Sequence, residues 1–72
     1  MLIKLNTPAD KVDEIINAMP SLKRPTVSDL YKTGYYAVES VVDKKEVNLL
    51  IPKLKNLGAE DILELRINKI VY

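Results

Sequence analysis

The order of strand-like and helical segments constrains the fold of this chain more than any other feature. Two segments carry apolar residues at helical spacing, and short strand-like runs flank each of them. The resulting order, β-α-β-β-α-β, predicts an α+β, ferredoxin-like fold: a four-stranded antiparallel sheet with both helices on one face. The apolar stripes of the two helices are Val12, Ile15, Ile16 and Met19, and Val47, Leu50, Ile51, Leu54 and Leu57.

Helix-capping, proline and turn residues set the expected boundaries of the helices and strands in the first half of the chain. Met1 to Leu5 alternate as a short strand, and Thr7 fits the N-cap of the first helix with Pro8 at its first position. Pro20 ends that helix. Residues 21–25 are expected to form a loop, 26–31 the second strand, 32–34 a turn and 35–42 the third strand.

In the second half, Asp43 is expected to cap a helix over 44–57, with Glu46 at capping-box spacing. Pro52 lies inside this helix, which we expect to bend there and continue because its apolar stripe keeps phase. Gly58 stands where a left-handed C-terminal residue is needed. Residues 62–65 and 67–71 form the last strand region.

A chain of 72 residues makes one small domain, residues 1–72, which buries only about 60% of its unfolded surface. It has no cysteine and no histidine, so disulfides and a zinc site of these residues cannot supplement its core. Both faces of the 35–42 strand are mostly apolar, although helices are expected to cover only one. We therefore expect the open face of the sheet to be an interface.

Composition argues against several functional classes. Eleven basic and ten acidic residues give a net charge of +1, which provides no electrostatic footprint for nucleic acid or anionic membrane. Tyr35 and Tyr36 are consecutive strand residues whose rings point to opposite faces, so they do not form the stacking platform of a ferredoxin-like RNA-binding domain. No apolar run reaches membrane-spanning length, and the N-terminus lacks a signal-peptide pattern. Cytoplasm is the expected location.

The segment from Lys23 to Ser28 is the most distinctive part of the chain. Pro25 holds Arg24 out of helical geometry, and Thr26 and Ser28 supply hydroxyl groups. Loop amides and hydroxyls of this kind can bind the carboxylate of a small anion or zwitterion. On physical grounds alone, a solvated basic loop whose hydroxyls cap turn amides is the more common arrangement.

Several segments together resemble the C-terminal regulatory domain of long-form ATP phosphoribosyltransferase, the first enzyme of histidine biosynthesis. The Pro-Thr-Val-Ser run at 25–28 precedes a strand containing Ala-Val-Glu at 37–39. The Leu-Lys-Asn-Leu-Gly-Ala run at 54–59 and the Ile-Asn-Lys-Ile run at 67–70 are similar to the family's later segments. Each of these segments alone is weak evidence for the family. Together they span the chain, and their combination is specific to the family.

This resemblance implies a non-catalytic domain that binds histidine as feedback inhibitor between subunits and helps to hold a trimer or hexamer together. The implied ligand-binding residues are Asn6, Leu22, Thr26, Val41 and Asp61. No catalytic or metal-binding residue and no cofactor are implied for this domain. Magnesium is expected only with the catalytic domains of the parent enzyme, which are further expected partners.

Two alternatives remain open at this stage. The domain could be a structural module that oligomerises through its open sheet face and binds no ligand. It could also be a general amino-acid-binding domain of the same β-α-β-β-α-β plan, without specificity for histidine.

Overall fold

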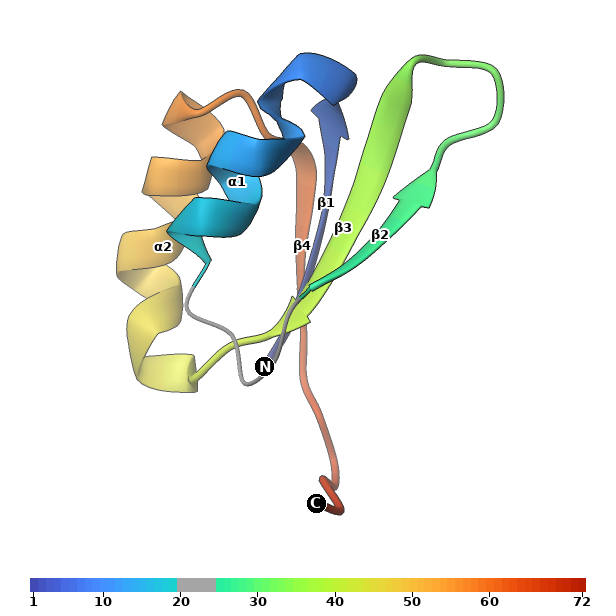
Figure 1. Cartoon of the computed structure of the whole chain (residues 1–72). Coiled ribbons are helices and arrows are strands. Elements are labelled where there is room, and N and C mark those ends of the chain that lie inside the picture. Colours follow the sequence, from blue (N-terminus) through green and yellow to red (C-terminus); the bar gives the residue numbers. More distant parts are fainter. Residues whose placement is uncertain (20–24) are drawn as a thin grey trace.

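The computed structural model describes residues 1–19 and 25–72 and has the predicted order of elements. Its strands form one antiparallel sheet in the order β2-β3-β1-β4, and both helices cover the same face (Figure 1). The predicted ferredoxin-like fold is thus confirmed. The elements are β1 (Leu2–Pro8), the 3₁₀ turn η1 (Ala9–Lys11), α1 (Val12–Ala18), β2 (Thr26–Asp29), β3 (Tyr35–Val41), the 3₁₀ turn η2 (Lys44–Glu46), α2 (Val47–Asn56) and β4 (Glu60–Leu65).

The core lies between the helices and the two central strands. On β1, Ile3 and Leu5 point toward the helices and are fully buried, whereas Lys4 between them is exposed. This alternation is the one that the sequence predicts. Both helices, β3 and the segments beside them supply the rest of the core. These residues are Ile15, Met19, Val38, Val42, Val47, Leu50, Leu54 and Ala59.

Thr7 does not cap the first helix, contrary to the prediction. The β1 strand continues to Pro8, because Thr7 and Pro8 remain in register with Tyr36 and Tyr35 of β3. The Thr7 side chain is fully buried in the core-facing row, and its hydroxyl donates a hydrogen bond to the Pro8 carbonyl at 3.2 Å. The helix consequently starts later, after the η1 turn, and pairing along the sheet outweighs the local capping signal.

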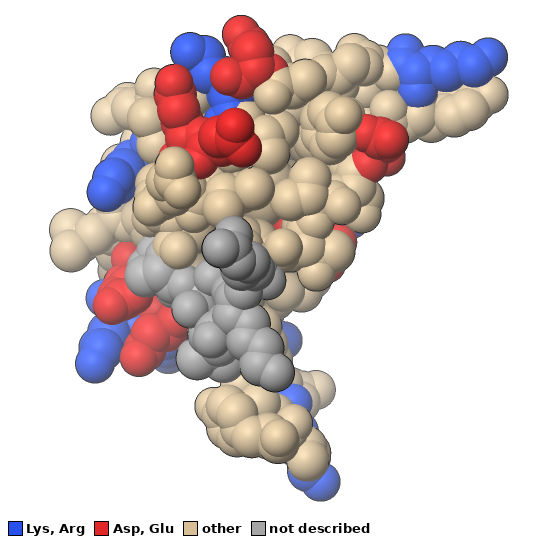
Figure 2. Space-filling model, in the orientation of Figure 1, with Lys and Arg blue, Asp and Glu red and all other residues tan. Residues whose placement is uncertain are grey.

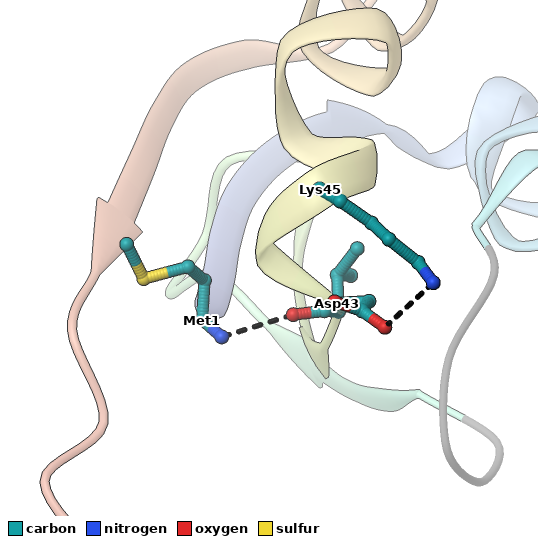
Figure 3. Close-up of polar contacts among 4 residues, drawn as sticks. Met1, Asp43 and Lys45 are labelled. Carbon is teal, nitrogen blue, oxygen red and sulfur yellow. Dashed lines mark hydrogen bonds and ion pairs between the residues drawn. The ribbon is translucent and has the colours of Figure 1, made fainter.

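The predicted capping box at the start of the second helix is also absent. Asp43 precedes the η2 turn, but its carboxylate makes no capping hydrogen bond and lies 3.9 Å from the Lys45 ammonium (Figure 3). The Glu46 amide instead donates to the backbone carbonyl of Asp43 at 3.0 Å. Nearby, the Met1 amino group donates to the Val42 carbonyl at 2.9 Å, which closes the end of the β1–β3 ladder (Figure 3).

The α2 helix runs without interruption through Pro52, as predicted. Proline removes one hydrogen-bond donor from the helix, and the carbonyl of Asn48 loses its usual partner. Asn48 and Pro52 are both exposed, so water can satisfy that carbonyl. Helix termination at Gly58 is confirmed too: φ is +104°, and the amides of Gly58 and Ala59 donate to the carbonyls of Lys55 and Leu54, the pattern of a Schellman motif.

The last strand is shorter than the sequence predicts. The β4 strand ends at Leu65, opposite Leu2 at the start of β1, and residues 66–72 are not in a strand. The predicted strand over 67–71 is therefore wrong. Its apolar residues have strand propensity, but β1 offers no partner beyond Leu2. The segment instead extends away from the sheet as a tail (Figure 1).

Candidate functional site

The sheet face opposite the helices has an apolar end and a polar end. Leu2 is paired with Val41 on one side and Leu65 on the other, which gathers apolar side chains at the end where β1 begins. In the middle, cross-strand partners Lys4 and Glu39 approach to 3.9 Å. The open face is thus only partly apolar. We call Leu2, Val41, Leu63 and Leu65 the apolar end, and Asn6, Tyr35, Glu60 and Asp61 the polar end.

Two of the predicted site residues meet at the polar end. The Asn6 side-chain amide donates a hydrogen bond to a carboxylate oxygen of Asp61 at 3.1 Å, although 55 positions separate them in the sequence. Asn6 is half-buried on β1, and Asp61 is exposed on β4. One lone pair of that oxygen and the whole of the other oxygen remain for a further donor.

A β-bulge places Asp61 beside Asn6. Lys4 and Asn6 are two residues apart on β1, whereas their partners Leu63 and Glu60 are three apart on β4. Asp61 adopts φ of +51°, the left-handed conformation that an aspartate tolerates better than most residues. The predicted last strand began at residue 62, but Asp61 already lies within β4. The bulge turns its carboxylate toward Asn6.

Tyr35 and Glu60 add a second polar contact at this end of the sheet. The neighbouring Glu60 carboxylate favours the protonated phenol of Tyr35, both as a hydrogen-bond acceptor for its hydroxyl and through its negative charge. Burial and the more distant charges of Asp10 and Asp61 act in the same direction. Together they raise the pKa of Tyr35 above its ordinary value. The polar end therefore carries concentrated negative charge.

Replacing Glu60 with glutamine is expected to lower the pKa of Tyr35. Because that pKa is raised in the folded state, the contact stabilises the fold below the unfolded pKa of about 10. This contribution is lost as pH rises through the higher folded value. Titration of a ring-labelled Tyr35 by NMR measures the shift directly, with Glu64→Gln on the same strand as a control. An unchanged Tyr35 titration in Glu60→Gln would exclude the contact.

The other predicted site residues lie elsewhere. Val41 belongs to the apolar end, four strand positions from the level of Asn6, which corresponds to about 14 Å. Thr26 begins β2 at the level of Lys4, two strands away, and lies roughly 12 Å from Asn6. Leu22 lies outside the described residues. A single copy thus brings Asn6 and Asp61 together but keeps Thr26 and Val41 apart from them.

Sequence reasoning did not identify Tyr35 and Glu60 as neighbours of the site. Glu60 precedes Asp61, and Tyr35 opens β3, so their contact depends on the register of three strands. An acidic pair directly after the helix-ending Gly58 and Ala59 was the only local signal. That signal does not specify which side chains it will meet.

The face drawn in the space-filling view has no dominant charge. Figure 2 shows acidic and basic side chains interspersed over the visible face. Within residues 1–19 and 25–72, no three acidic side chains are grouped in a way that could hold a metal ion. None of the helices in this part of the chain is both long and apolar enough to span a membrane.

Comparison with known families assigns the chain. The family model described as "HisG, C-terminal domain" matches residues 1–69. The chain belongs to the HisG C-terminal domain family. This result confirms the family that the sequence segments indicated.

Members of the HisG family among curated proteins are similar over nearly the whole chain. An ATP phosphoribosyltransferase of Geotalea daltonii is 46% identical over 69 residues, 96% of this chain. The enzyme of Desulfatibacillum aliphaticivorans is 47% identical over 97% of the chain. That of Desulforudis audaxviator is 39% identical over 96% of the chain. In all three, the chain spans only 24% of the relative's length.

Proposed function

We propose that this chain is the non-catalytic regulatory domain of an ATP phosphoribosyltransferase, acting in histidine biosynthesis. In this proposal, it binds histidine as a feedback inhibitor at a boundary between copies. The match to a C-terminal domain that amounts to 24% of the relatives' length supports a role outside the catalytic part. The observation that carries the ligand assignment is the Asn6–Asp61 pair at the β-bulge.

The chemistry of the polar end suits the cationic groups of an amino acid. An α-ammonium or a ring N–H donates hydrogen bonds, and the Asp61 carboxylate has acceptor capacity left beyond its bond from Asn6. Glu60 adds negative charge beside it. A charged hydrogen bond of this type is about twice as strong as one between neutral groups.

The ligand carboxylate needs a different environment. Thr26 and Ser28 lie on the exposed β2 strand, and their side chains share the open face with Asn6. Their hydroxyl groups can donate to a carboxylate. Because Thr26 is roughly 12 Å from Asn6 within one copy, we place the complete site between the polar end of one copy and β2 of a second.

Such a site provides a mechanism of regulation. A ligand shifts an equilibrium between subunit arrangements only by binding one of them more tightly. Histidine that contacts two copies at once stabilises the arrangement in which the polar end and β2 face each other. Catalytic domains attached to these copies would then respond to histidine without contacting it.

Calorimetry with a panel of amino acids tests this function. We expect saturable binding of histidine, with weaker binding of leucine, lysine and glutamate at equal concentration. Thr26→Val keeps the side-chain shape but removes the hydroxyl, and it is expected to weaken histidine binding about five- to tenfold. Ser40→Ala, on the helix-facing side of β3, serves as a control.

The outcomes separate the candidate functions. Equal binding of all four amino acids would favour a general amino-acid sensor. An absence of binding in an assembled oligomer would favour a purely structural module. The apolar end of the open face, where Leu63 and Leu65 are 52% and 43% exposed, is the observation that supports this second candidate.

A further inference from the structure

The C-terminal tail, residues 66–72, presents apolar side chains to solvent. It leaves β4 in an extended path away from the sheet (Figure 1), and it carries basic side chains at the bottom of the space-filling view (Figure 2). Val71 and Tyr72 are 85% and 98% exposed. Ile70–Tyr72 also lie beyond the residues matched by the family model. The tail has the composition of a strand, but within the described ranges it pairs with no other strand.

The β2 strand is the complementary feature, because it forms one edge of the sheet. Among residues 1–19 and 25–72 it pairs only with β3, so one side of its backbone has no neighbouring strand in this part of the chain. All four of its residues are exposed, and Val27 is 38% exposed on the side of the sheet that the helices cover elsewhere. Unpaired amides and carbonyls along an edge are a template for an additional strand.

The tail cannot easily reach the β2 strand of its own copy. A strand added beside β2 would lie four strand spacings, about 19 Å, from β4, whereas Lys69 can lie at most about 14 Å from Leu65, the last residue of β4. The tail also continues beyond the end of the sheet instead of crossing it (Figure 1). An occupant of the β2 edge that comes from this chain must therefore belong to a second copy.

We propose that residues 69–72 of one copy add to β2 of a second copy as an antiparallel fifth strand. The register pairs Asp29 with Lys69 and Val27 with Val71 on the helix side of the sheet. On the open side it pairs Ser28 with Ile70 and Thr26 with Tyr72. This contact is separate from the Asn6–Asp61 pair of the proposed histidine site, because the tail leaves the sheet at the end opposite these two residues.

Charge and apolarity match along this register. Asp29 meets the Lys69 ammonium, and opposite charges in direct cross-strand positions are favourable. Within the described part of the chain, neither residue belongs to an ion pair. Val71 would cover Val27, which no helix shields. Shifting the tail by one residue would place Ile70 opposite Asp29 and lose the charge pair.

The exposed area of the chain is consistent with a missing partner. A compact folded monomer of this size exposes about 4,500 Å². This chain exposes 5348 Å². The excess, about 800 Å², is comparable to the area that each partner buries in a standard protein interface.

Charge reversal tests the contact. Sedimentation measurements over a range of concentrations would compare wild type with Asp29→Lys and Lys69→Asp. Each single variant is expected to weaken association about five- to tenfold, because it places like charges opposite each other. Lys44→Asp on the exposed η2 turn lowers the net charge by the same amount as Lys69→Asp and is expected to associate like wild type.

Mixing the two variants provides the decisive observation. Asp29→Lys carries lysine at both positions and Lys69→Asp carries aspartate at both, so each tail matches only the other chain's edge. The equimolar mixture should regain wild-type association within about twofold. A chain ending at Arg66 should lose at least about tenfold in association while still unfolding cooperatively.

Unchanged association in both single variants, or in the chain ending at Arg66, would overturn the tail contact. So would a failure of the mixture to recover. None of these results removes histidine binding at Asn6 and Asp61, which calorimetry measures separately. The failure of the tail contact is therefore distinguishable from the failure of the proposed function.

Discussion

Leu54→Ala is expected to destabilise the fold by about 2–5 kcal/mol. Leu54 is fully buried on α2, where it belongs to the core between the helices and the sheet. The loss combines the hydrophobic transfer term with the cavity left behind. A domain of this size has a total stability of only about 4–11 kcal/mol, so this single change removes a large share of it.

Urea unfolding at a fixed protein concentration measures this effect, since association changes apparent stability. Leu49→Ala is the matched control: the same substitution on the same helix, at a position that is 83% exposed. It should change stability by no more than about 0.5 kcal/mol. Equal effects of the two substitutions would contradict the placement of the core.

Substitutions at Asp61 are expected to separate its backbone role from its chemical role. Asp61→Gly retains the left-handed conformation at no steric cost, whereas Asp61→Ala keeps the Cβ but loses the short polar side chain that makes this conformation tolerable, at a cost of up to about 1–2 kcal/mol. Both remove the carboxylate that accepts from Asn6. Both should therefore weaken histidine binding about 10- to 100-fold, the value of a hydrogen bond to a charged group.

Thermal unfolding and calorimetry on the same samples distinguish the two roles. Asp61→Gly should unfold close to wild type yet bind poorly. Asp13→Ala, at an exposed acidic position on α1, should bind like wild type. Wild-type histidine affinity in Asp61→Gly would remove Asp61 from the proposed site, whatever its effect on stability.

The fold was largely predictable because its signals are periodic. Helical spacing of apolar residues located both helices, and alternation located the faces of β1. The end of the second helix at Gly58 was also predictable from the sequence, because a positive φ strongly favours glycine. These signals act within a few residues of one another, and nothing in the tertiary structure opposes them.

Two of the errors occurred where neighbouring strands decide the outcome. Thr7 has the local character of a helix cap, but pairing of β1 with β3 keeps it in the sheet. Residues 67–71 have strand character but no strand partner among the residues that the structure describes. In both cases the deciding contact is made by residues far away in the sequence, which local propensity does not contain.

The candidate site was predictable in part for the same reason. The family resemblance named Asn6 and Asp61 separately, and their hydrogen bond depends on a bulge that shifts β4 by one residue. The contact of Tyr35 with Glu60 depends on the same register. Periodicity gives the face on which each residue lies, but it does not give the residue opposite.

The central claim is that histidine binds between Asn6 and Asp61 of one copy and Thr26 of another. Mixing Asp61→Ala chains with Thr26→Val chains tests it most directly, with calorimetry counting high-affinity sites. Each variant alone should have none. If the site is shared between copies, the equimolar mixture should regain about a quarter of the wild-type number of sites. Half of the chains keep Asp61 and the other half keep Thr26, so a randomly assembled site contains both intact residues about one time in four. A site contained within one copy predicts no recovery, and that result would contradict the account.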